Sequence, residues 1–128
     1  MKNKRKINAI FNMNNKTVAI FGGTGKIGTN FAKVLSLAGA NVIILDIKEK
    51  KIDKKNKKIS FIKCDVGSEN QIKHAINDII KNFKKIDVLI YNVYSKPKQY
   101  YKKFINYESN TWKNVINVNL TGAYLATK

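Results

Sequence analysis

A glycine-rich turn between an apolar run and an amphipathic segment constrains the fold of this chain most. Residues 17–28 read Thr-Val-Ala-Ile-Phe-Gly-Gly-Thr-Gly-Lys-Ile-Gly, which predicts a buried strand that turns into a helix. Gly22, Gly25 and Gly28 stand three residues apart. The first permits a tight turn, the second lets backbone N–H groups approach a pyrophosphate, and the third lets the helix pack closely on its strand.

The start of the predicted helix adds a site for an anion. The first N–H groups of a helix have no partner within it, and they carry a partial positive charge. We therefore expect this turn to bind the phosphates of a dinucleotide. The expected contacts come from the three glycines and from the residues between them, Thr24, Lys26 and Ile27.

An acidic residue follows at the spacing of a dinucleotide site. Residues 41–46, Asn-Val-Ile-Ile-Leu-Asp, predict a second buried strand, and Asp46 lies 18 residues after Gly28. A carboxylate at an offset of about 20 residues reaches the ribose hydroxyls of the adenosine half. Because the same carboxylate repels a 2′-phosphate, we expect NAD as the cofactor in preference to NADP. The helix between the two strands, 26–38, is expected to bury one apolar face: Ile27, Phe31, Val34, Leu35 and Ala38.

The rest of the chain continues the alternation of strands and helices. Residues 59–63 and 86–91 predict a third and a fourth strand, and the fourth is apolar enough to be covered on both faces. Ser68 and Gln71 form a predicted capping box at the start of a helix. The last helix, from about Glu108 to the end, is expected to bury Trp112, Val115, Ile116, Leu120 and Ala123. This order predicts an α/β fold, a Rossmann-like doubly wound parallel sheet with strand order 3-2-1-4.

The high positive charge does not have the pattern of a nucleic-acid site. The formal net charge is +17, and the densest run, Lys48–Lys58, contains no aromatic residue and no arginine. Nucleic-acid sites interleave their charge with stacking aromatics or forked arginines. We predict a solvated linker there and no nucleic-acid partner. A basic nucleic-acid binder is the third-ranked function, and salt-dependent DNA binding would reveal it.

Other features limit the setting of the protein. No apolar run is long enough to span a membrane, so no membrane partner is expected. The single cysteine, Cys64, excludes an internal disulfide, which favours a reducing cytoplasm. His74 lies off the apolar face of its helix, and no metal site is predicted. We expect residues 1–15 to form a basic, disordered extension and residues 16–128 to form the domain.

Asn119 interrupts the apolar face of the last helix. An amide in such a position costs about 1–3 kcal/mol unless it finds hydrogen-bond partners. Spacing alone leaves two interpretations open. One is a satisfied core asparagine, and the other is a hydrogen-bond hub in a catalytic site.

From Lys16 to Lys128, these residues resemble the short-chain dehydrogenase/reductase family. The glycine loop is similar to the form of the extended branch, since Lys26 stands where the other main branch has a glycine. Asp65 and Val66 are similar to the pair that holds the adenine ring. The resemblance thus implies that both residues bind the cofactor.

Two later segments carry the same resemblance. Residues 86–92 are similar to the strand that leads to the family's Asn-Asn-Ala-Gly motif, which places Asn92 at the cofactor. Residues 112–122 are similar to the helix that carries the asparagine of the catalytic tetrad. The resemblance assigns that role to Asn119, which would anchor a water molecule in a proton relay.

The chain also departs from the family pattern. Tyr91, Val93 and Tyr94 replace three of the four residues of the Asn-Asn-Ala-Gly motif. The family's catalytic serine and its helical Tyr-x-x-x-Lys pair would follow Lys128. Residues 94–98 fit the Tyr-x-x-x-Lys spacing, but they contain a proline and precede the helix of the tetrad asparagine. We therefore expect an incomplete family domain, the N-terminal part of a longer enzyme, which is inactive alone.

The resemblance implies an NAD(P)-dependent oxidoreductase that moves hydride between the cofactor and a carbonyl or alcohol. The expected partner is a small-molecule substrate, and the full-length parent is expected to be a homo-oligomer. A faint similarity of the loop after Asn92 to oxidoreductases of bacterial surface-sugar pathways suggests a sugar derivative. Two alternatives stay open: an extended-type sugar-nucleotide epimerase or dehydratase, and a non-catalytic dinucleotide-binding protein.

Overall fold

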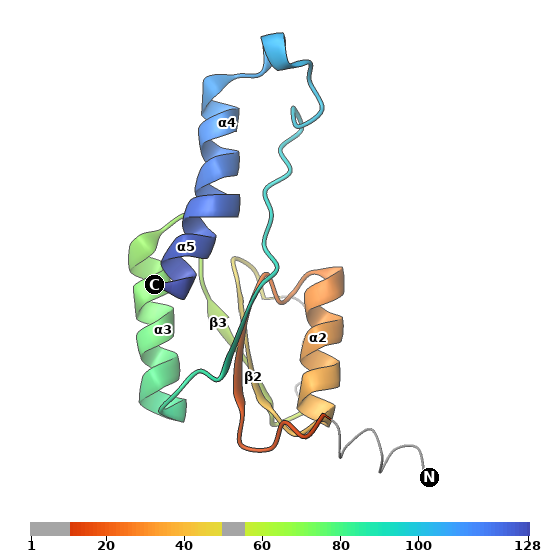
Figure 1. The fold of residues 1–128 in the computed structure, drawn as a ribbon, viewed down its shortest axis with the longest axis vertical. Helices are drawn as coiled ribbons and strands as arrows, with labels where there is room; N and C mark the ends of the chain where they lie inside the picture. The colour runs from red at the N-terminus through yellow and green to blue at the C-terminus, as the bar shows by residue number, and fades with distance from the viewer. Residues whose placement is uncertain (1–10, 50–55) are drawn as a thin grey trace.

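A parallel four-stranded sheet forms the centre of the protein (Figure 1). The computed structural model describes residues 11–49 and 56–128. The strand order is β3-β2-β1-β4, which confirms the predicted Rossmann-like fold class and topology. The strands are β1 (Thr17–Phe21), β2 (Asn41–Asp46), β3 (Ile59–Lys63) and β4 (Val88–Tyr91).

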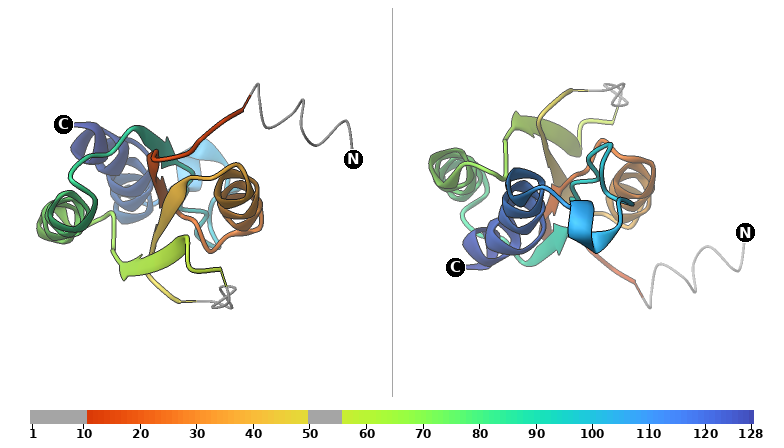
Figure 2. Two further views of the ribbon diagram at one scale, coloured as in Figure 1. Left: turned by 90° about the horizontal axis from the view of Figure 1, so that it is seen from below. Right: turned by 90° about the horizontal axis from the view of Figure 1, so that it is seen from above.

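Helices cover both faces of the sheet (Figure 2). Helix α2 (Lys26–Leu37) lies on one face, and α3 (Glu69–Phe83) and α5 (Gly122–Thr127) lie on the other. Helix α4 (Ser109–Ile116) continues into α5 through a π-helical segment, η2 (Asn117–Thr121). The connection from β4 to α4 carries a short 3-10 turn, η1 (Phe104–Asn106), at the end of the molecule above the sheet in Figure 1.

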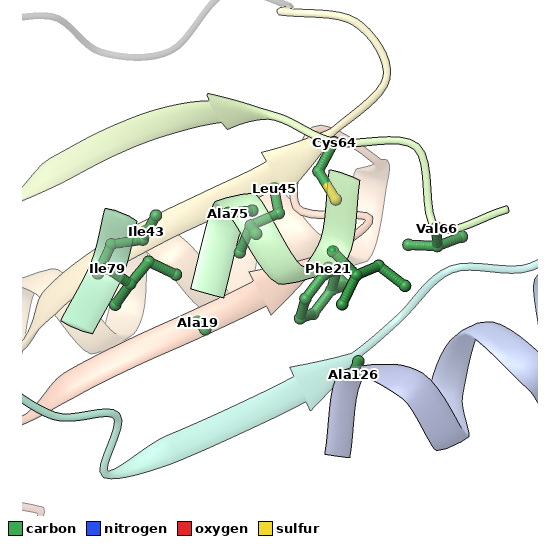
Figure 3. Close-up of a cluster of buried hydrophobic side chains, with 10 residues drawn as sticks. Ala19, Phe21, Ile43, Leu45, Cys64, Val66, Ala75, Ile79 and Ala126 are labelled. Atoms are coloured by element: carbon green, nitrogen blue, oxygen red, sulfur yellow. The ribbon is translucent and has the colours of Figure 1, made fainter. Parts of the chain in front are cut away.

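Side chains of β1 and β2 alternate between two cores, because successive residues of a strand point to opposite faces. One core joins the sheet to α2 and contains Val18, Ile20, Ala32, Ala40, Val42 and Ile44. The other joins the sheet to α3 and α5 (Figure 3), and it contains Ala19, Phe21, Ile43, Leu45, Cys64, Val66, Ile72, Ala75, Ile79 and Ala126. Because both faces of β1 and β2 are covered, these strands need the continuous apolar sequences from which they were predicted.

The face of α2 that packs on the sheet differs from the predicted one. The buried residues of this helix are Gly28, Ala32 and Ser36, whereas Phe31 is 43% exposed and Val34 is 62% exposed. A Cβ atom on Gly28 would lie 2.5 Å from the carbonyl oxygen of Gly22. The close approach there brings forward the small residues that recur every four positions, which turns Phe31 and Val34 away from the sheet. Leu35, also predicted to face the core, is half-buried and does pack against it.

The predicted apolar face of the last helix is only partly right, since Val115, Ile116 and Ala123 are half-buried and the other two predicted residues are exposed. Trp112 is 55% exposed and Leu120 is 64% exposed, while Gly122 and Ala126 are buried. Trp112 precedes the π-helical segment and lies in α4, which extends beyond the sheet (Figure 1). For the residues from η2 onward the π-helical segment is the physical reason, since the N–H of Gly122 bonds to the carbonyl of Asn117, five residues back. One extra residue per turn rotates the following face by about 100°, so the regular spacing of an α-helix fails across η2.

Strand β4 is shorter and more exposed than predicted. It begins at Val88 instead of Ile86, and all four of its residues are only half-buried. It lies at one edge of the sheet and pairs with β1 alone among the described strands. The expectation that both of its faces are fully covered is therefore not met.

Several expectations fall partly or wholly outside the described residues. These are the basic extension, of which residues 1–10 are not described, and the lysine run, of which residues 50–55 are not described. Met13 is described, and its N–H donates to the carbonyl of Ala38 at 3.0 Å while its side chain packs on the α2 core. His74 is exposed, as predicted. None of the helices in the described ranges is long and apolar enough to cross a membrane.

Asp87 joins the amino ends of β1 and β4, whereas the glycine loop lies at the carboxyl ends of the strands. Its carboxylate accepts from the N–H of Thr17 at 2.8 Å, from Lys85 Nζ at 3.0 Å and from Lys16 Nζ at 3.2 Å. The Thr17 hydrogen bond and then the Lys85 ammonium lower the pKa of Asp87 from 3.8 to about 2. The ionised carboxylate is thus bound more favourably in the folded chain than in the unfolded chain.

We expect Asp87→Asn to destabilise the protein in a pH-dependent way. The folded-state pKa lies below the unfolded value, so the contribution is fully present above about pH 4 and is lost as the pH falls through about 2. Urea unfolding should therefore separate the variant from the wild type near neutral pH, and the difference should shrink at low pH. Asp78→Asn, on the exposed side of α3, is the matched control. An equal effect of the two substitutions would contradict the assignment.

Candidate dinucleotide site

A cavity of about 730 Å³ lies at the carboxyl ends of the strands. In open parallel sheets this edge is where ligands bind. Nine of the ten residues predicted to contact a cofactor line it; Gly28 does not, because it packs beneath the loop. The nine are Gly22, Thr24, Gly25, Lys26, Ile27, Asp46, Asp65, Val66 and Asn92.

Each of the three positions is a glycine for a different structural reason. Gly22 has a φ of +73°, and a Cβ there would lie 2.9 Å from the backbone carbonyl carbon of Asn92. A Cβ on Gly28 would overlap the backbone of Gly22 and Gly23. At Gly25 the nearest atom to a Cβ is the Gly22 carbonyl oxygen at 3.4 Å, an ordinary contact. Folding thus requires glycine at positions 22 and 28, whereas position 25 would accept a side chain that projects toward the cavity.

Backbone hydrogen bonds hold the glycine loop against the neighbouring strands. The N–H of Gly22 donates to the carbonyl of Leu45 at 2.8 Å, which fixes the loop on β2. The side-chain amide of Asn92 donates to the carbonyl of Gly22 at 3.3 Å. The backbone N–H of Asn92 donates to the carbonyl of Phe21 at 2.9 Å. Asn92 therefore joins the end of β4 to the turn that the phosphates would approach.

Asp46 ends β2 and is tied to the same loop. Its Oδ2 accepts from the N–H of Thr24 at 3.1 Å and from the Thr24 hydroxyl at 2.7 Å, and its Oδ1 accepts from the N–H of Ile47 at 2.8 Å. Thr24 is buried, and Asp46 is half-buried. The carboxylate predicted to bind ribose is therefore held in one orientation at the wall of the cavity.

The turn after β3 brings Asp65 and Val66 to the cavity. Asp65 Oδ1 accepts from the N–H of Gly67 at 2.9 Å, and Val66 is buried. Ser68 Oγ accepts from the N–H of Gln71 at 3.4 Å, as a helix cap does. The second half of the predicted capping box is wrong, because the Ser68 N–H is taken by the Asp65 carbonyl at 3.0 Å. The Gln71 side chain accepts instead from the N–H of Asp65 at 2.9 Å, and so supports the turn.

Asn119 lies in the π-helical segment and is half-buried. Its Oδ1 accepts from the N–H of Ser95 at 2.6 Å, and Ser95 lines the cavity although Asn119 itself does not. Two neighbouring amides act in the same way: Asn114 donates to Ser95 Oγ at 3.2 Å, and Asn117 donates to the Gly67 carbonyl at 3.2 Å. This helix therefore fixes the connections that follow β3 and β4.

We expect Asn119→Ala to destabilise the protein by about 1–3 kcal/mol, since it leaves the part-buried N–H of Ser95 without its acceptor. Asn119→Asp keeps an oxygen at the same position and should retain most of the stability. Equilibrium unfolding in urea measures both. If the two substitutions cost the same, the hydrogen bond to Ser95 is not the reason for an asparagine here.

The sequence did not reveal that Tyr91 connects β4 to the last helix. Its hydroxyl donates to the carbonyl of Val118 in the π-helical segment, and a Cβ on Gly122 would overlap that hydroxyl. Burial, and to a lesser extent Cys64, raises the pKa of Tyr91 to about 12, so the hydroxyl is a donor at neutral pH. The signals were a tyrosine at the end of β4 and a glycine inside a helix, but spacing does not show that the two meet.

The Tyr-x-x-x-Lys spacing of residues 94–98 has no helical structure. Tyr94 is 67% exposed and begins a segment without regular structure. The tyrosine and lysine are therefore not stacked on one helical turn, and this segment lacks the geometry in which a lysine could tune the tyrosine.

The chain is similar to known dehydrogenases over nearly its whole length. The family model for short chain dehydrogenase matches residues 16–128. A mitochondrial borneol dehydrogenase from Lavandula x intermedia is 32% identical, and the match covers 88% of this chain and 44% of the relative. A secoisolariciresinol dehydrogenase from Forsythia intermedia is 31% identical, with 88% and 42% covered. The chain thus spans less than half the length of these relatives.

Solved structures show the same architecture. A short chain dehydrogenase from Leptospira borgpetersenii with bound NAD+ has a TM-score of 0.78 and 25% identity, and the match covers 91% of this chain and 44% of that one. A structure of ElxO with NADPH bound also has a TM-score of 0.78, with 27% identity and 88% and 47% covered. The glycine loop, the strand order and the match over residues 16–128 agree: the chain belongs to the short-chain dehydrogenase family.

Proposed function

We propose that this chain forms the cofactor-binding part of an NAD-dependent oxidoreductase that acts on a carbonyl or alcohol of a small molecule. The observation that carries the proposal is the cavity that brings the glycine loop, Asp46, Asp65 and Asn92 together. These residues are far apart in the sequence, and the parallel sheet alone places them at one edge. The space left open at Gly25 fits a group that must approach the backbone closely.

Each part of a dinucleotide has candidate partners in this cavity. The loop from Gly22 to Gly28 would hold the pyrophosphate, Asp46 the adenosine ribose, and Asp65 with Val66 the adenine. Asn92 supports the loop from the end of β4. When bound, the nicotinamide would supply the hydride chemistry, and Asn119 would hold the connection after β4 in place and anchor a water molecule for proton transfer.

NAD in preference to NADP is part of the proposal. At an effective dielectric near 20, two charges about 4 Å apart interact by about 4 kcal/mol, so a 2′-phosphate beside Asp46 would be strongly disfavoured. Lys48 also lines the cavity and opposes this effect in part. The related structures contain NAD+ in one case and NADPH in another, so the relatives support a nicotinamide cofactor of either kind.

We propose a small-molecule alcohol or carbonyl as the substrate, without a narrower class. The names of similar proteins include a borneol dehydrogenase and an aldohexose dehydrogenase, which are chemically different. A sugar derivative, which the loop after Asn92 suggests, is one such molecule. A reducing, cytoplasmic setting belongs to the same proposal, because Cys64 is the single cysteine of the chain, is buried and free, and cannot form an internal disulfide.

We further propose that the 128-residue chain binds the cofactor but does not catalyse conversion of a substrate. General acid–base transfer contributes about 10²–10⁴-fold to such reactions. A neutral amide such as Asn119 neither gives nor takes a proton near neutral pH. The family's Tyr-x-x-x-Lys pair has no helical counterpart in residues 94–98.

Calorimetric titration of the purified chain with NAD and with NADP, beside an absorbance assay for reduced cofactor, tests this proposal. The expected result is weak, saturable binding with NAD the tighter ligand, and no turnover. Tighter binding of NADP would overturn the cofactor assignment. The extended-type alternative rests on Lys26 at the start of α2, and it predicts binding of a sugar nucleotide in addition to the dinucleotide. Rapid NAD-linked turnover would show that a catalytic group lies within the chain, first of all at Tyr94 and Lys98.

A further inference from the structure

The hydrogen bonds around Asp46 limit how it can bind a ribose. A carboxylate has two oxygens and about four lone-pair sites. Both sites of Oδ2 are used by Thr24, through its N–H at 3.1 Å and its hydroxyl at 2.7 Å. The N–H of Ile47 uses one site of Oδ1 at 2.8 Å. One lone-pair site, on Oδ1, is left for a ligand.

Thr24 is limited in the same way. Its hydroxyl has one hydrogen, which is committed to Asp46 in a short charge-assisted bond. The hydroxyl oxygen can therefore accept hydrogen bonds but has no hydrogen to donate. Thr24 and Asp46 both line the cavity, and together they present acceptors only. A ribose diol, with two O–H donors, matches this pair, whereas a 2′-phosphate offers only acceptors and negative charge.

We propose that Thr24 is a positioning residue that sets the choice between a free and a phosphorylated 2′-hydroxyl. It acts by fixing the Asp46 carboxylate and by serving as the second acceptor for the diol. This inference rests on the proposed function, because it assumes that the cavity binds the adenosine half of a dinucleotide. It goes further because it assigns the discrimination between NAD and NADP to Thr24 of the glycine loop as well as to Asp46.

Thr24→Val tests the role of the hydroxyl, because valine has nearly the same shape and keeps the backbone N–H bond to Asp46. The Asp46 carboxylate then keeps only its hydrogen bonds to the N–H groups of residues 24 and 47 and is held less firmly, and the ribose diol loses the hydroxyl oxygen as an acceptor. Thr24→Ser is the matched control, since it retains the hydroxyl. The probes are ADP-ribose and its 2′-phosphate, titrated into the full 128-residue chain and followed by amide NMR shifts, which also show whether each variant is folded.

The wild type should bind ADP-ribose more tightly than its 2′-phosphate. In Thr24→Val we expect the ratio of the two dissociation constants to fall about tenfold, and in Thr24→Ser to stay within about twofold of the wild type. An unchanged ratio of dissociation constants in Thr24→Val, or an equal fall of that ratio in Thr24→Ser, would overturn the role of the hydroxyl. Neither result would contradict the assignment of the cavity as the dinucleotide site. If neither probe shifts the cavity amides of the wild type, the proposed function fails, and this inference fails with it.

Discussion

Replacing Gly25 by valine is expected to abolish detectable dinucleotide binding and to leave the chain folded. The backbone at Gly25 has φ −70° and ψ 167°, which any residue can adopt. A Cβ there meets nothing closer than 3.4 Å, so the cost in stability should stay near the 1 kcal/mol or so of an altered helix cap. The side chain would occupy the space that the pyrophosphate needs, and we expect affinity to fall by about 100-fold or more. Calorimetric titration and urea unfolding measure the two effects separately.

Gly22→Val is the matched comparison. It places a branched side chain at a φ of +73° and within 2.9 Å of the Asn92 backbone, so it should reduce stability and binding together. The account requires the two variants to differ in stability. If Gly25→Val binds NAD as tightly as the wild type does, the pyrophosphate does not bind at this loop.

Phe21→Ala is expected to cost about 3–5 kcal/mol of unfolding free energy, the largest effect of any single core truncation that we foresee here. Phe21 has no exposed surface and is the largest of the fully buried side chains (Figure 3). Its ring lies 5.9 Å from that of Tyr91, and it packs in the core that joins the sheet to α3. It also directly precedes Gly22, so its removal loosens the base of the glycine loop.

Phe21→Leu is the control, because it keeps most of the apolar volume and should cost far less than the alanine substitution. Chemical denaturation monitored by circular dichroism compares the three proteins. A similar, small loss for alanine and leucine would mean that the core between the sheet and α3 is not closely packed at this position.

Much of the fold follows from the sequence because its signals are local. The run from Thr17 to Phe21 and the run from Asn41 to Asp46 are continuous and apolar, as strands covered on both faces must be. The observed bounds of the second and third strands are those predicted. The glycine loop and Asp46 were found from a local motif and its spacing, whereas Asp65, Val66 and Asn92 came from the family resemblance. Parallel strands bring all of them to one edge of the sheet.

The failures share a different cause, since they depend on contacts that the periodicity of a single helix or strand does not contain. The buried face of α2 is set by the approach of Gly28 to the Gly22 carbonyl, which no helical periodicity contains. The π-helical turn changes the phase of the last helix, and its Val118 carbonyl receives the Tyr91 hydroxyl from another element. The partner of Gln71 depended likewise on which acceptor had already taken the Ser68 N–H.

Mapping NAD onto the 128-residue chain by amide NMR tests the central claim most directly. The account predicts saturable shifts confined to the loop from Gly22 to Gly28 and to the strand ends around Asp46, Asp65 and Asn92, with little dependence on salt. Shifts spread over the exposed lysines and lost at high salt, with the glycine loop unchanged, would contradict it.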